Sequence, residues 1–211
     1  MIFPIAAITV VLVFYASFGV AAPGVGPPGT SFENITYAGS GCPAGTVQAH
    51  PSPDWANFTL TFDKFTPQAG PGVLITERRK SCHVNAKIRV PLGYQYTPYQ
   101  LEWSGRLVLD KKVRYTFQAD HGFAALTNQK ATFAFTVTGP FADSFDFIHT
   151  LPDAALIWSP CGGAGDGSLN INMQVYLDSS QNPAATFPAP EFPSVFPESI
   201  NTRYHLQWRK C

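Results

Sequence analysis

"SLNINMQVYLD", residues 168–178, shows most clearly the pattern that indicates the fold class. Large apolar residues occupy every second position of this stretch, and polar residues occupy the positions between them. A strand with this alternation has one face in a hydrophobic core and the other toward water, which is typical of antiparallel sheets. The polar face consists of Asn170, Asn172, Gln174 and Tyr176.

The same period-2 pattern recurs on both sides of this stretch, between turns rich in Gly, Pro, Asn and Asp. It is visible in "NFTLTFDKF" (57–65), "HVNAKIRV" (83–90), "VRYTFQAD" (113–120) and "TFAFTVTGP" (132–140), and we expect further strands at Tyr99–Asp110, Ala155–Ser159 and Tyr204–Cys211. About eight or nine strands without a long amphipathic helix predict an all-β fold, an antiparallel two-sheet β-sandwich. We expect it to form a single domain over residues 33–211.

The amino-terminal residues predict export. Residues 1–22 are almost wholly apolar and uncharged, and Val20 and Ala22 stand where a signal-peptide cleavage site has small residues. A membrane anchor is the alternative, but no basic cluster follows the run. We therefore expect a signal peptide cleaved after Ala21 or Ala22, a flexible lead-in at residues 23–32, and a secreted protein free of the membrane.

The cysteines fit the same compartment. Cys42, Cys82, Cys161 and Cys211 are even in number and widely spaced, as in a disulfide framework. Four cysteines allow three pairings. We favour Cys42–Cys82 and Cys161–Cys211, because each bridge then stays within one half of the chain.

Two N-x-[ST] sequons indicate glycosylation, and the charge balance limits the classes of binding partner. The sequons predict N-glycosylation at Asn34 and Asn57. The chain has 14 basic and 14 acidic residues, and charged residues make up only 13% of it. This balance gives no electrostatic footprint for nucleic acid or for an anionic membrane.

The cysteine contexts resemble one family. They read "GSGCPAGTV" (39–47), "RRKSCHVNAKIRVPLGYQY" (78–96), "IWSPCGG…SLNIN" (157–172) and "YHLQWRKC" (204–211). In order and spacing they resemble the secreted domain-of-unknown-function family 4360, found mostly in fungi, over residues 33–211. The resemblance implies a secreted, disulfide-bonded β domain and no assigned activity, so it transfers no catalytic residue.

Known motifs for cofactor or metal chemistry are missing from the sequence. The loop at residues 162–168 has glycines but no lysine for a phosphate loop, and only Asp166 as a carboxylate for calcium. We expect a tight turn there, with glycines at positive φ angles. The five histidines show no metal-binding spacing, and no G-x-S-x-G occurs. We predict no cofactor, no metal and no catalytic residue.

Sugar binding without catalysis requires fewer specialised groups than hydrolysis does. Aromatic rings stack on sugar rings, and amides bond to hydroxyls. The candidate ligand-binding residues are Tyr94, Tyr96, Tyr99, Trp103, Asn170 and Asn172. The structural alternative is that these aromatic rings cover the edge of the core with their polar tips in water.

Three functions remain open at this point. The first is a non-catalytic extracellular protein of the cell wall or of a host surface that binds polysaccharide. The second is a secreted polysaccharide hydrolase, with Glu102 as one carboxylate and Asp63, Asp110 or Asp178 as the other.

The third function is docking to an extracellular protein through the Pro- and Phe-rich segment 182–200, which we expect to be extended. Its phenylalanines, Phe187, Phe192 and Phe196, either fill the open side of the sandwich or form an exposed ridge. The sequence leaves the oligomeric state open.

Overall fold

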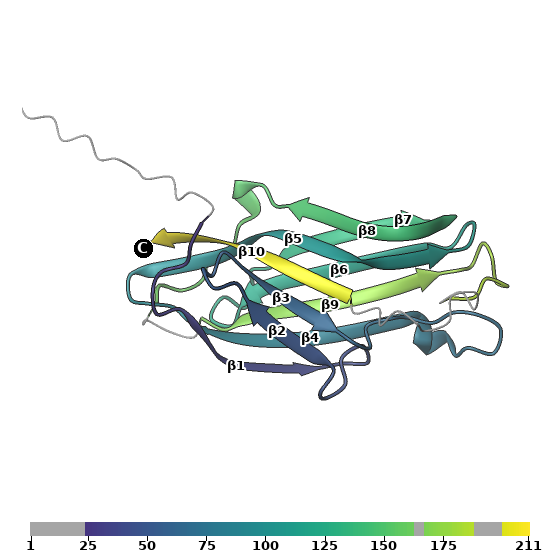
Figure 1. Ribbon diagram of the computed structural model, residues 1–211, viewed down its shortest axis with the longest axis horizontal. Helices are drawn as coiled ribbons and strands as arrows, with labels where there is room; N and C mark the ends of the chain where they lie inside the picture. Colours follow the sequence, from purple (N-terminus) through teal and green to yellow (C-terminus); the bar gives the residue numbers. More distant parts are fainter. Residues whose placement is uncertain (1–23, 163–166, 188–199) are drawn as a thin grey trace, which may run out of the picture.

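The computed structural model describes residues 24–162, 167–187 and 200–211, which form an all-β fold (Figure 1). Two short 3-10 helices, η1 (Ile75–Arg78) and η2 (Asp153–Ala155), are the helical elements of these residues. The strands are β1 (Ser31–Ala38), β2 (Val47–Pro51), β3 (Asn57–Phe62), β4 (Arg79–Arg89), β5 (Tyr94–Leu109), β6 (Arg114–Phe123), β7 (Ala131–Thr138), β8 (Phe141–Thr150), β9 (Leu169–Asp178) and β10 (Ile200–Lys210).

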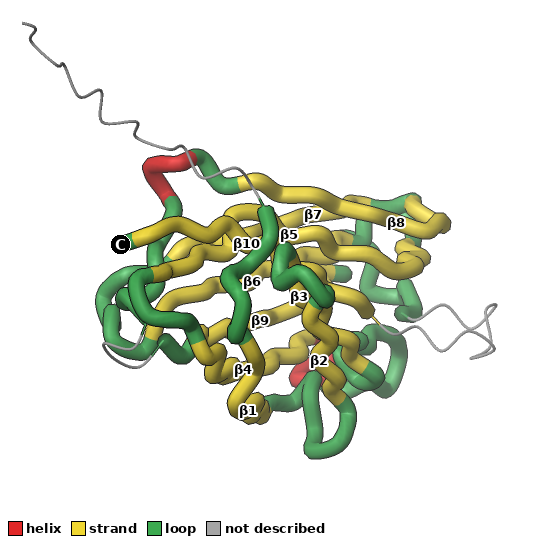
Figure 2. Tube along the Cα trace, turned by 60° about the vertical axis from the view of Figure 1, so that its left-hand side comes forward, coloured by secondary structure: helices red, strands yellow, loops and turns green. Residues whose placement is uncertain are grey.

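The strands form two antiparallel sheets of five strands each (Figures 1 and 2). Sheet A has the order β1-β4-β9-β6-β7, and sheet B has the order β2-β3-β10-β5-β8. The chain crosses from one sheet to the other several times, so strands distant in sequence pair with each other. The predicted two-sheet β-sandwich is confirmed.

The core lies between the two sheets. The ring of Trp103 in β5 lies 4.3 Å from that of Phe117 in β6, in a stacked arrangement across the sandwich. The apolar positions of β9, from Leu169 to Leu177, are all at most 2% exposed. The alternation of residues 168–178 therefore has the predicted origin, with one face in the core and one outside.

Two disulfides staple the sandwich, with the pairing that we favoured. Cys42–Cys82 joins the segment after β1 to β4, with 5.5 Å between the Cα atoms. Cys161–Cys211 joins the segment after η2 to the end of β10, with 6.0 Å between the Cα atoms.

Several element boundaries differ from the sequence prediction. The described residues contain ten strands, because β1, β2 and β8 were not among the strands we expected. Residues 155–159 form no strand, although Ser159 N–H donates to the Tyr96 carbonyl at 2.8 Å. Pro152 and Pro160 flank this stretch, and proline lacks the N–H that a ladder needs. β5 begins at Tyr94, before the predicted Tyr99.

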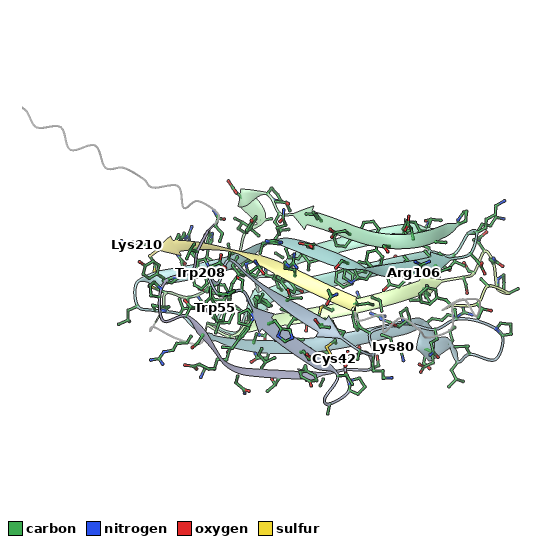
Figure 3. The ribbon with its side chains drawn as sticks, in the orientation of Figure 1. Cys42, Trp55, Lys80, Arg106, Trp208 and Lys210 are labelled. Carbon is green, nitrogen blue, oxygen red and sulfur yellow. A yellow bond between two sulfur atoms is a disulfide. The ribbon has the colours of Figure 1, made fainter. Side chains whose placement is uncertain are left out.

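The lead-in is held against the sandwich over residues 24–30. Gly26 N–H donates to the Asp54 carbonyl at 2.6 Å, and a Cβ on Gly26 would meet Trp55 Cβ at 2.6 Å and Trp208 at 3.1 Å. Trp208 Nε1 in turn donates to the Trp55 carbonyl at 2.9 Å (Figure 3). The lack of a side chain on Gly26 lets the chain lie against these tryptophans. The expected signal peptide, residues 1–22, lies outside the described residues.

One phenylalanine of the Pro- and Phe-rich segment is described. Phe187 is 8% exposed and forms a bridge with Ala69, and its ring lies 6.1 Å from that of Tyr115. Phe187 therefore packs against the core, as expected if it fills the side of the sandwich. Phe192 and Phe196 lie outside the described residues.

Candidate ligand-binding surface

The outer face of sheet A carries polar side chains in rows across the strands. His83 of β4 lies opposite Asn172 of β9, and Asn172 lies opposite Asp120 of β6. The next row places Asn85 opposite Asn170. Successive side chains of a strand point to opposite faces, so these residues share the solvent side of the sheet.

Polar side chains bond to one another along these rows. Three cross-strand pairs form what we call the amide ladder: Asn85–Asn170, His83–Asn172 and Gln118–Gln174. An N–H···O bond of 2.7 Å joins the first pair, an Nδ1···Oδ1 contact of 2.5 Å the second, and an N–H···O bond of 3.3 Å the third. Each primary amide has two N–H donors and an oxygen with two lone pairs, so these bonds use only part of its capacity.

Two shallow grooves follow the ladder across sheet A. Groove 1 has a volume of about 420 Å³ and is lined by Thr36, Tyr37, Ala38, His83, Val84, Asn85, Asn170 and Asn172. Groove 2 has a volume of about 280 Å³ and is lined by Arg79, Thr116, Gln118, Gln174 and Tyr176. Tyr176 is 46% exposed and, among the described residues, is the large aromatic residue of this face that is classed as exposed. Arg79 also donates to Gln174 Oε1 beside it.

The carboxylate of Asp120, next to the amide ladder, is balanced by a neighbouring cation. Burial disfavours the charged form of Asp120, but hydrogen bonds from Gln118, Thr132 and Lys130 outweigh it and lower its pKa. These bonds measure 3.0, 2.7 and 3.2 Å, and Lys130 also forms an ion pair with the carboxylate. The outer face of sheet A is therefore rich in hydrogen-bonding groups with little unbalanced charge around Asp120.

The six candidate residues from the sequence separate into three places. Asn170 and Asn172 lie in groove 1 of sheet A. Tyr96 and Trp103 are completely buried, so their rings are not part of any surface. Tyr94 and Tyr99 are half-buried on β5, in the opposite sheet. The structure thus does not unite the aromatic and amide groups in one site, because positions 96 and 103 point inward.

The outer face of sheet B carries a charged cluster instead. Arg203 Nη1 donates to both Glu102 oxygens at 3.1 Å, and His205 Nε2 lies 3.3 Å from Glu102 Oε2. The Tyr99 ring lies 6.3 Å from that of His205. Glu102, the best carboxylate of the hydrolase hypothesis, is therefore bound to side chains of the neighbouring strand.

The three carboxylates proposed as its partners lie far away. Asp110 directly follows β5, the strand that contains Glu102. At about 3.3 Å per residue, the Cα atoms of Asp110 and Glu102 are about 26 Å apart. Thr59 of β3 and Glu102 of β5 both lie opposite Arg203 of β10, and Asp63 is four residues further along the chain from Thr59. The Cα atoms of Asp63 and Glu102 are therefore roughly 16 Å apart. Asp178 lies on the outer side of the other sheet. Glycoside hydrolysis needs the two carboxyl groups within about 10 Å, so none of these pairs fits.

Sequence reasoning missed several residues of the grooves. Arg79, His83, Asn85 and Gln118 stand at outward positions of β4 and β6, as the alternation of those stretches indicates. The sequence carries no sign that β4 and β6 both flank β9, so the amides of three strands were not recognised as one surface. Tyr176 was recognised as part of the polar strand face that could bind sugar, but not among the six candidate residues.

The glycine-rich loop at residues 162–168 is only partly described. A Cβ on Gly162 would lie 2.0 Å from the Pro91 carbonyl oxygen, so close backbone contact requires glycine there. Gly162 does not have the positive φ that we expected. Among the described residues no group of three or more His, Cys, Asp or Glu side chains is placed to hold a metal, and no helix is long and apolar enough to cross a membrane.

Comparison with known proteins identifies the family. The model of the Domain of unknown function (DUF4360) family matches residues 29–211. The chain belongs to this family. An uncharacterized secreted protein from Arthroderma benhamiae is 32% identical over 189 residues, which cover 88% of this chain and 73% of the relative. This DUF4360 protein is secreted, as the sequence predicted.

Two solved structures show a distant likeness to this DUF4360 chain. A structure of TmCBM61 in complex with β-1,4-galactotriose has 9% identity and a TM-score of 0.29, and covers 85% of this chain and 90% of that one. A CBM4 structure has 12% identity and a TM-score of 0.24, with coverages of 83% and 86%. TM-scores this low carry no argument about a ligand.

Proposed function

We propose that this secreted protein binds polysaccharide, without catalysis, through the outer face of sheet A. The observation that carries the proposal is the amide ladder along two grooves, with the half-exposed ring of Tyr176 at one end. Sugar hydroxyls both donate and accept hydrogen bonds, and primary amides match them in both roles. An exposed tyrosine ring offers an apolar face for the C–H side of a pyranose.

The charge pattern favours a neutral polymer. Asp120 is paired with Lys130, and Glu33 at the far edge is paired with Lys87 at 3.1 Å. A strongly anionic polysaccharide would need several cations along the grooves, and their linings hold one arginine, Arg79, and no lysine. Chitin, β-glucan and cellulose are therefore the polymers to test first.

The experiment incubates the purified protein with each insoluble polymer and measures both depletion from the supernatant and released reducing sugar. We expect depletion without sugar release. The double variant Asn170→Ala/Asn172→Ala should lose depletion, while Ile148→Ala, at an exposed site on sheet B, should keep it. Sugar release would overturn the non-catalytic proposal. A lack of depletion on all three polymers would direct the search to an extracellular protein partner.

We also propose that the signal peptide, residues 1–22, is removed and that Asn34 and Asn57 carry N-glycans. Support comes from the placement of the sequons: Asn34 is exposed in β1, and Asn57 is half-buried at the start of β3. Intact-mass spectrometry of the secreted protein, before and after enzymatic deglycosylation, tests both the cleavage site and the glycans.

A further inference from the structure

The first sequon lies on the same face as the proposed ligand site because of a β-bulge. Strand β1 has a register shift between Phe32 and Asn34. Phe32 and Ile35 both pack against the core, which regular alternation does not allow for residues three apart. The extra residue of the bulge, Glu33, re-aims the side chain that follows it. Asn34 is therefore exposed on the outer face of sheet A, opposite Lys87.

Asn34 also lies close to groove 1. Thr36, the third residue of the sequon, lines this groove and lies opposite Asn85 of the amide ladder. Two residues of an extended strand span about 6.6 Å, so a glycan on Asn34 begins within one sugar or two of the groove. Asn85 is in turn bonded to Asn170 at 2.7 Å.

We infer that an N-glycan on Asn34 lies along groove 1 and competes there with external polysaccharide. The inference rests on the proposed function, because the same amides would bind the hydroxyls of both sugars. A tethered group has a high local concentration, in the millimolar range for a short flexible link, so it occupies even a weak site much of the time. While the glycan covers the groove, external polymer binds only the uncovered fraction.

The second sequon provides the matched control. Asn57 begins β3 and pairs with His205, on the outer side of sheet B. A glycan on Asn57 therefore starts on the opposite side of the sandwich from groove 1. Removing it changes the total glycan content of the protein without uncovering the groove.

The test uses the full secreted protein from a glycosylating eukaryotic host, as wild type, Asn34→Gln and Asn57→Gln. Mass spectrometry first measures the occupancy of each sequon, and depletion isotherms then use the polymer that wild type binds best. We expect Asn34→Gln to tighten apparent binding about three- to tenfold, as when a glycan covers the groove for two-thirds to nine-tenths of the time. Asn57→Gln should bind as wild type does. An unoccupied Asn34, or equal isotherms for all three proteins, would overturn the inference.

A second readout separates this inference from the proposed function. His83 lines groove 1, and His50 is exposed on β2 of sheet B. We expect diethyl pyrocarbonate to modify His83 faster in Asn34→Gln than in glycosylated wild type, and His50 at equal rates in both. If none of the proteins binds a polymer, the proposed function fails, and the His83 rates still decide whether the glycan covers the groove. Equal His83 rates would contradict coverage.

Discussion

The two outer faces of the sandwich share their strand geometry and differ in their chemistry. On sheet A, neutral amides bond in pairs from strand to strand next to the exposed ring of Tyr176, and two ion pairs, Glu33–Lys87 and Asp120–Lys130, lie beside them. On sheet B, the carboxylate of Glu102 is held by Arg203 and His205. An ion pair satisfies its members locally, whereas a paired amide keeps donors and acceptors for a ligand. The difference supports our placing the polysaccharide on sheet A.

The largest expected effect is a loss of stability when a residue buried beneath the outer face of sheet B is truncated. Trp103→Ala should lower the free energy of unfolding by about 4 kcal/mol, the usual cost of removing a buried aromatic side chain. Its ring is fully buried and stacks on Phe117 at 4.3 Å and Tyr115 at 5.4 Å. Urea denaturation measures the change. Tyr99→Ala, nearby but half-buried, is the control and should cost clearly less. Equal costs would contradict a core role for Trp103.

The next effect concerns a histidine beneath the sheet A face. Burial lowers the pKa of His121 from 6.5 to about 4, although the charge of Asp120 opposes the shift. Between pH 6.5 and about 4, the unfolded chain therefore binds a proton at His121 that the folded chain does not bind. The free energy of unfolding thus has its full value above pH 6.5 and falls as the pH drops toward 4. The loss amounts to about 3 kcal/mol at about 1.4 kcal/mol per pKa unit.

Denaturation at a series of pH values measures this loss. His121 stacks on Phe133 with ring centroids 5.2 Å apart, so His121→Phe keeps an aromatic ring in place. The variant should show a much smaller slope of stability between pH 4 and 6.5. An unchanged slope would mean that surface carboxylates, not His121, produce the pH dependence.

The contrast between core and surface also explains what the sequence revealed. Residues 168–178 predicted a half-buried strand because side chains alternate with period 2, and every apolar position of that stretch is buried. The pairing of the four cysteines was favoured correctly from their spacing alone. The strand predicted at residues 155–159 was wrong: this segment begins at the end of η2, and Pro160 directly after it lacks the N–H that a sheet ladder needs.

The candidate site was less accessible to sequence reasoning. Tyr96 and Trp103 are of the aromatic types that stack on sugar rings, but both occupy inward-facing positions of β5. Asn170 and Asn172 were recognised because their own strand alternates clearly. Their partners come from β4 and β6, and the pairing of strands distant in sequence depends on crossovers that no local pattern encodes.

A substitution on the exposed ring tests the ligand face itself. Tyr176→Ala should weaken polysaccharide binding roughly fivefold, since a stacking contact contributes about 1 kcal/mol. It should leave the unfolding midpoint nearly unchanged, because the side chain is 46% exposed. Tyr176→Phe keeps the ring and should retain most of the affinity. Depletion isotherms on the bound polymer measure both, and a loss of binding in Tyr99→Ala instead would move the ligand to sheet B.

The smallest effect is expected for the charged cluster of sheet B. Glu102→Gln removes the ion pair with Arg203 and changes the contact with His205, whose side chains are 45% and 23% exposed. Exposed pairs contribute about 0–1 kcal/mol, so the free energy of unfolding should fall by no more than about 1 kcal/mol. Binding to polysaccharide should stay at the wild-type level, because Glu102 lies on the face opposite the ladder. If wild type released sugar and Glu102→Gln did not, the carboxylate would be catalytic and the functional contrast between the two faces would be reversed.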